Sequence, residues 1–190
     1  GDVERALDVL KVEKDPESLT QFVHRCKERG IQAEALWGQL SKAEDTTVRY
    51  GLLLALGEFT GQEIEEHRQE WVKQLSEWYR TDPKSSIHSV CGWLLRQWGE
   101  TKRLEVVDQT PFAYSPGQEW FVEKIDCGDG KTFDYYTFIV FGPKPGEKSV
   151  VFQMGSGADA HTVRLTHPFA LSEREVSSAQ YDHLRSPGED

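Results

Sequence analysis

The sequence lacks several features that would assign it quickly to a functional class. No apolar run approaches the roughly 18–20 residues of a membrane-spanning helix, so no membrane role is expected. Cysteine is scarce: Cys26, Cys91 and Cys127 are the three present, and no Cys-x-x-Cys pair indicates a zinc knuckle or a redox dithiol. We therefore expect buried, unreactive thiols in a reducing compartment and a cytoplasmic protein.

Positive charge is also in deficit. Lys and Arg number 22 against 32 Asp and Glu, which gives a formal net charge of -10 at pH 7. A chain this acidic is repelled by phosphate backbones and anionic lipid, so neither nucleic acid nor a membrane surface is an expected partner. Aromatic residues are well represented, at 11% of 190 residues, which excludes wholesale disorder and predicts a packed core.

Signatures of catalytic and ligand-binding sites are missing or incomplete. Gly130-Lys131-Thr132 is similar to the end of a phosphate-binding loop, but Ile125 stands where that loop needs glycine, and a strand-like segment follows. No Gly-x-Ser-x-Gly nucleophile motif occurs. We therefore expect no enzymatic activity, no catalytic, cofactor-binding or metal-binding residue, and no cofactor.

The first hundred residues have the apolar periodicity of amphipathic helices. Apolar residues recur at i, i+3, i+4 and i+7, and Asp45 and Asp82 offer capping side chains. When Leu19, Val48 and Ile87 are aligned, the intervals straddle the period of two-helix solenoid units, which favours a helical repeat; a small helical bundle is the alternative. The expected helices span residues 3–12, 17–29, 33–40, 47–59, 63–80 and 86–98.

The pattern changes after Gly99. Residues 101–118 contain Pro111, Pro116 and Gly117 and are typical of a connecting segment. Apolar and polar residues then alternate as in strands, and a closing helix is expected over 172–184. The sequence thus predicts an α+β protein with a helical repeat-like domain over 1–100, a linker over 101–118 and a mixed, β-rich domain over 119–190. The expected strands span 120–125, 132–141, 149–154 and 161–165.

Ordered motifs in the last third resemble a known family. They are Tyr136-Thr-Phe-Ile-Val140, Phe152-Gln-Met-Gly-Ser156, His161-Thr-Val-Arg-Leu165 and Pro168-Phe-Ala-Leu-Ser-Glu-Arg-Glu-Val-Ser-Ser-Ala-Gln-Tyr181. Together they look like the opening of the formylglycine-generating enzyme (sulfatase-modifying factor) family, a variant of the C-type-lectin-like fold. The resemblance implies that residues 119–190 form the N-terminal part of such a domain. The catalytic cysteines and most metal ligands of that family belong to its C-terminal half, so no catalytic residue carries over.

The helical half adds to this resemblance. Tyr50-Gly-Leu-Leu-Leu-Ala-Leu-Gly-Glu-Phe59 and Trp93-Leu-Leu-Arg-Gln-Trp-Gly99 are similar to HEAT-like helical-repeat segments that precede such domains in large bacterial multidomain proteins. The resemblance implies a non-catalytic protein-interaction or regulatory module of a bacterial signalling or defence-type protein. Two alternatives stay open. One is the N-terminal portion of a copper-dependent oxidase that makes formylglycine, and the other is a protease substrate or proteolytic product.

The expected partner is a protein or a missing domain of the same polypeptide. Aromatic side chains anchor many interfaces, so Trp37 and Trp78 are the candidate partner-binding residues, although both have the spacing of ordinary core residues. A truncated mixed sheet leaves an unpaired edge and an uncovered apolar face. We therefore expect the β-rich part to be held by the helical part, by a partner or by a second copy.

Overall fold

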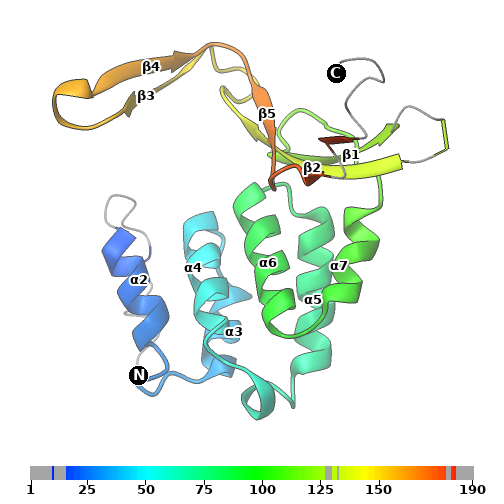
Figure 1. Cartoon of the computed structure of the whole chain (residues 1–190). Helices are drawn as coiled ribbons and strands as arrows, with labels where there is room; N and C mark the ends of the chain where they lie inside the picture. Colours follow the sequence, from blue (N-terminus) through cyan, green and yellow to red (C-terminus); the bar gives the residue numbers. More distant parts are fainter. Residues whose placement is uncertain (1–9, 11–15, 127–129, 132, 179–180, 183–190) are drawn as a thin grey trace. The chain divides into compact units, whose positions relative to one another are not determined.

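The computed structural model describes residue 10 and residues 16–126, 130–131, 133–178 and 181–182. The fold is α+β, with helices followed by small antiparallel sheets (Figure 1). The chain divides into two compact units, Gly1–Val107 and Asp108–Asp190. In the part of the chain that is described, no helix is long and apolar enough to cross a membrane.

The expected helices that fall within the described residues are present, with shifts at their ends. The segment over 33–40 is confirmed without change, whereas the helix expected over 63–80 begins only at Arg68, because a 3-10 turn and irregular turns precede it. Apart from Leu10, the helix expected over 3–12 lies outside the described residues. The elements are α2 (Pro16–Arg25), α3 (Ala33–Leu40), α4 (Thr46–Leu56), η1 (Gly61–Glu63), α5 (Arg68–Thr81), α6 (Ser85–Gln97) and α7 (Thr101–Asp108).

Local chemistry explains where several helices begin and end. The Asp45 carboxylate accepts hydrogen bonds from the backbone N–H of Thr47 at 2.8 Å and of Val48 at 3.0 Å, which caps α4 as the sequence predicts. Gly30 and Gly99 follow α2 and α6 with φ of 76° and 79°, a left-handed conformation that glycine adopts without strain. The sequence therefore encodes these helix ends locally.

The helical unit has a continuous core. Buried leucines come from the four successive helices α3 to α6 and from α7, so each of these helices turns its apolar stripe inward as the periodicity indicates. One expectation fails at the end of this unit: residues 101–108, expected to belong to a linker, form helix α7, and Leu104 joins the core. The prolines that suggested a linker begin only at Pro111, after the helix has ended.

The β unit contains two separate antiparallel sheets. The first has the order β1-β2-β5, and the second is a two-stranded ribbon of β3 and β4 (Figure 1). All four strands expected from the alternation are confirmed to within about two residues. The strands are β1 (Trp120–Asp126), β2 (Phe133–Phe141), β3 (Val150–Met154), β4 (His161–Leu165) and β5 (Phe169–Ser172), and the short turn η2 (Gly157–Asp159) joins β3 to β4.

The helix expected over 172–184 is wrong in its first part. Ser172 is the last residue of β5, and residues 173–177 are not helical. The reason is a backbone hydrogen bond: the N–H of Glu173 donates to the carbonyl of Thr137 at 2.8 Å, so the chain continues along β2. Helical residues begin at Ser178, and residues 183–184 of the expected helix lie outside the described part.

Candidate interaction surfaces

Trp37 and Trp78, the partner-binding residues expected from the sequence, lie in a cluster of stacked rings within the helical unit. The ring centroid of Trp37 lies 4.8 Å from that of buried Trp71 and 5.7 Å from that of Trp78. The ring of His67, the residue before α5, stacks on Trp71 with the ring centroids 5.2 Å apart. Trp98 approaches Trp71 at 6.3 Å. Stacking of this kind stabilises a pair by about 0.5–1.5 kcal/mol beyond the area it buries.

A cation and an ion pair adjoin this cluster. The Arg49 guanidinium lies 5.3 Å from the centroid of the Trp78 ring and forms an ion pair with Asp82 at 2.9 Å. Both charged side chains are largely buried, with 18% and 8% of their surface exposed, so the pair joins α4 to the loop before α6. Trp37 and Trp78 are half-buried and contribute to internal packing. Their role in partner binding stays a prediction.

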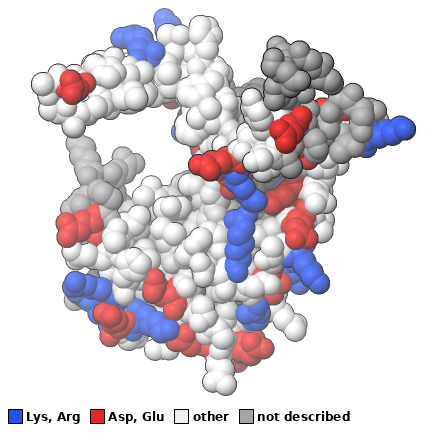
Figure 2. All heavy atoms as spheres, viewed as in Figure 1, with Lys and Arg blue, Asp and Glu red and all other residues white. Residues whose placement is uncertain are grey.

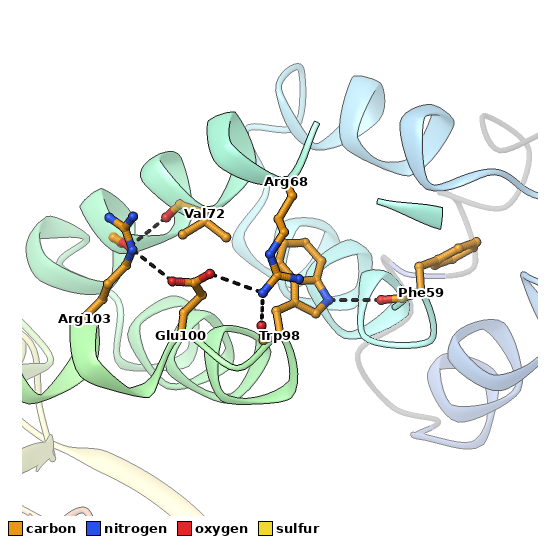
Figure 3. Close-up of polar contacts among 7 residues, drawn as sticks. Phe59, Arg68, Val72, Trp98, Glu100 and Arg103 are labelled. Atoms are coloured by element: carbon orange, nitrogen blue, oxygen red, sulfur yellow. Dashed lines mark hydrogen bonds and ion pairs between the residues drawn. The ribbon is translucent and has the colours of Figure 1, made fainter. Parts of the chain in front are cut away.

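Polar contacts also tie the helical unit together (Figure 3). The Arg68 guanidinium donates to the carbonyl of Trp98 and contacts the Glu100 carboxylate at 3.2 Å, and Arg103 contacts the same carboxylate at 3.1 Å. The indole N–H of Trp98 donates to the carbonyl of Phe59 at 3.0 Å. These bonds give hydrogen-bond partners to polar groups at the end of α6. They also connect that end to α5 and α7.

The described cysteines offer no accessible nucleophile. Cys26 and Cys91 are 2% and 0% exposed, which confirms the expected burial. Burial raises the pKa of both thiols, so the reactive thiolate form is disfavoured. Cys127 lies outside the described residues. Within the ranges given above, no group of three or more His, Cys, Asp or Glu side chains is arranged to hold a metal ion.

The β3–β4 ribbon exposes apolar side chains to solvent. Val151, Phe152 and Met154 are 49%, 42% and 55% exposed, although they belong to a hydrophobic strand. Residues 149–158 contain no charged side chain, and Figure 2 shows the ribbon mostly white on the face in view. A two-stranded ribbon is only marginally stable in water by itself. A strand that is hydrophobic, exposed and uncharged is therefore an expected contact surface.

Apolar exposure continues on β5. Phe169 and Leu171 are exposed, and the Phe169 ring stacks on Phe141 of β2 at 5.7 Å. In contrast, only Trp120, Val122 and Tyr136 are buried apolar residues among those described in the β unit. The β unit thus has a small interior and a large apolar surface, which is the condition expected for a sheet that another segment covers.

A pocket of about 290 Å³ lies between β2 and the segment that follows β5. An ion pair between Arg174 and Asp108, at 3.4 Å, lies in its wall. The remaining lining is polar and aromatic, with acidic side chains outnumbering basic ones. The lining residues are Asp108, Tyr135, Tyr136, Thr137, Ser172, Glu173, Arg174, Glu175 and Ser177.

The pocket lies beside an open edge of β2. The N–H of Val140 donates to Glu119, on the β1 side, whereas the carbonyl of Thr137 accepts from Glu173, on the β5 side. Because backbone groups alternate along an antiparallel strand, the N–H and C=O of Phe133 and Tyr135 also point toward the β5 side. However, β5 pairs only with residues 138–141, and no described strand pairs with Phe133 or Tyr135 there. These four backbone groups define the open edge of β2.

Sequence reasoning predicts an unpaired sheet edge, but it did not locate this edge and it missed the pocket. Alternation locates β2, but it does not show that β5 is shorter than β2. The meeting of Asp108 with Arg174 joins residues that are far apart in the chain, so no local motif marks it. The two acidic residues Glu173 and Glu175, on either side of Arg174, were the one sequence signal for an acidic pocket.

Comparisons with known proteins add no relative: no family model, curated protein or solved structure matches this chain. The resemblance to the formylglycine-generating enzyme family therefore stays a prediction.

Proposed function

We propose that this chain is a non-catalytic protein-interaction module and that its β unit makes the principal contact. The observation that supports the proposal is the exposed apolar surface of the β3–β4 ribbon and of β5, on an otherwise acidic protein. Covering such surface yields about 25 cal/mol per Å² of apolar area, so a partner segment laid on this ribbon gains affinity from the side chains that water now contacts.

The helical unit acts in this proposal as a scaffold. Most of its apolar residues are buried in one cluster, and its helix ends are joined by hydrogen bonds and ion pairs. Trp37 and Trp78 are a secondary contact, because their rings are half-exposed on its surface. The lack of catalysis rests on the sequence, which carries no nucleophile or nucleotide motif. A place in a bacterial multidomain signalling or defence protein rests on the resemblance alone.

Photo-crosslinking at single positions tests the proposal. A benzoylphenylalanine introduced at Phe152 is expected to give one discrete, heavier adduct when the protein is expressed in its native cells, because that side chain lies on the uncovered strand. The partner in the adduct is identified by mass spectrometry and must then bind the purified chain directly.

The matched control carries the same photo-reactive residue at Glu66, an exposed position of the helical unit. We expect no discrete adduct there. Equal labelling of many proteins from both positions, or the absence of any adduct at Phe152, would contradict the proposed function.

A further inference from the structure

We propose that the partner supplies an extended, basic segment, which adds as a strand to the open edge of β2 in line with β5 and places a Lys or Arg side chain in the adjacent pocket. This inference rests on the proposed function and gives the partner its chemistry. Two independent features of the β unit support it, the hydrogen-bonding groups of the edge and the charge of the pocket.

The first feature is the backbone. Phe133 and Tyr135 direct two N–H and two C=O groups to the side of β2 that β5 leaves uncovered, as judged from the described residues. An added strand pairs with such groups as it would with a sheet neighbour, and these main-chain bonds supply affinity without a particular sequence. The backbone bends at Glu173 and Arg174, and the pairing of β5 with β2 ends at Phe138 and Ser172. β5 therefore does not extend as a strand alongside Phe133 and Tyr135.

The second feature is the charge beside that edge. Asp108, Glu173 and Glu175 line the pocket, and Arg174 is the one Lys or Arg among the lining residues. Arg174 contacts the Asp108 carboxylate, and the exposed Glu175 adds a further carboxylate to the pocket lining. A Lys or Arg side chain of the partner would bring the complementary charge and would meet the Tyr135 ring in the same wall. The pocket thus selects a cation, while the edge selects an extended backbone.

Charge also favours this occupant over a second copy of the chain. Each copy carries a formal net charge of -10, and pairing two copies at this edge would bring acidic pockets together. A basic segment is instead attracted from a distance, so its association rate should fall as salt is added.

The experiment uses the full chain and three synthetic octapeptides that carry a fluorescent label. The probe is Thr-Val-Lys-Val-Thr-Val-Lys-Thr, a second peptide has Glu in place of Lys, and a third is the lysine peptide with N-methyl groups on alternate amides. Fluorescence anisotropy should show saturable binding of the lysine peptide below about 1 mM, and binding weaker by about tenfold or more for each of the other two.

Matched charge reversals locate the site on the protein. Glu175→Lys is expected to weaken binding of the lysine peptide by about tenfold, whereas Glu66→Lys, the same change in charge on the helical unit, should weaken it by less than about threefold. Both positions are exposed. Circular dichroism is used to check that each variant folds. Equal weakening by the two variants would show nonspecific attraction to an acidic protein and overturn the proposal.

Three further results would overturn it: no binding of the lysine peptide, equal binding of the Lys and Glu peptides, or undiminished binding of the N-methylated peptide. Light scattering on the protein alone tests the other possible occupant, a second copy of the chain. A dimer that Glu175→Lys disrupts would assign the edge to that second copy and overturn the proposal. Failure here is distinguishable from failure of the proposed function. If a partner crosslinks at Phe152 but does not compete with the peptide, the proposed function stands. Its contact surface is then the β3–β4 ribbon and not the edge of β2.

Discussion

Trp71→Ala is expected to lower the free energy of unfolding of the helical unit by about 3–5 kcal/mol, the cost typical of removing a large aromatic side chain from a core. Trp71 is 3% exposed and stacks with the rings of His67 and Trp37, with Trp98 close by. Alanine would leave a cavity and remove all three ring contacts. Urea denaturation followed by far-UV circular dichroism measures the change, because the helices dominate that signal.

Trp93→Ala provides the matched control, since it deletes the same side chain at a position that is 36% exposed. Part of the Trp93 ring packs against Gly57, so the variant should lose some stability, but less than half of the loss at Trp71. Equal losses at the two positions would contradict the account in which the stacked cluster is the centre of the helical unit.

Gly142→Ala is expected to separate β5 from β2 without unfolding the helical unit. Gly142 has a φ of +125°, and a Cβ added there would lie 2.8 Å from the Pro168 Cα and 2.9 Å from the His167 carbonyl oxygen. The positive φ alone costs about 1–3 kcal/mol for a residue other than glycine, and the collision with backbone adds to it. Residues 167–168 lead directly into β5, so their displacement should disturb that strand first.

Amide hydrogen exchange resolves this effect. Exchange at Ile139, which pairs with Leu171 of β5, should accelerate roughly tenfold or more, while Val122, which donates to the Phe112 carbonyl at 3.0 Å, should not change. Gly146→Ala is the control: Gly146 also has positive φ, at +91°, but nothing lies within 4 Å of an added Cβ. If Gly146→Ala accelerated exchange at Ile139 as much as Gly142→Ala, the collision at β5 would not be the cause.

Local chemistry made much of this fold predictable. The Asp45 cap, the positive φ of Gly99 and the apolar stripe of each helix act within a few residues of where they are encoded, so the sequence locates the helices well. The strands follow from alternation for the same reason. The predictions failed where contacts between residues far apart in the sequence determine the structure. Leu104 packs into the core as part of a helix over 101–108, and the hydrogen bond from Glu173 to Thr137 keeps the start of the segment expected to be helical extended.

The candidate sites were predictable only in kind. An uncovered sheet was expected because the β-rich segment is short, and exposed Phe152 and Leu171 agree with that reasoning. The location of the open edge of β2 depends on the relative lengths of two strands that are far apart in sequence. Trp37 and Trp78 were chosen by residue type, and the ring stack that they share with Trp71 required three-dimensional information.

The central claim is that the β unit presents an edge prepared for another strand, and residue-resolved amide exchange of the full chain measures this most directly. We expect Tyr135 to exchange at least about 100-fold faster than Ile139, because β5 covers Ile139 and ends before Tyr135. Saturation with the lysine peptide should then slow Tyr135 and leave Ile139 unchanged. Exchange at Tyr135 as slow as at Ile139 in the chain alone would show that the edge is already paired, and would contradict the claim.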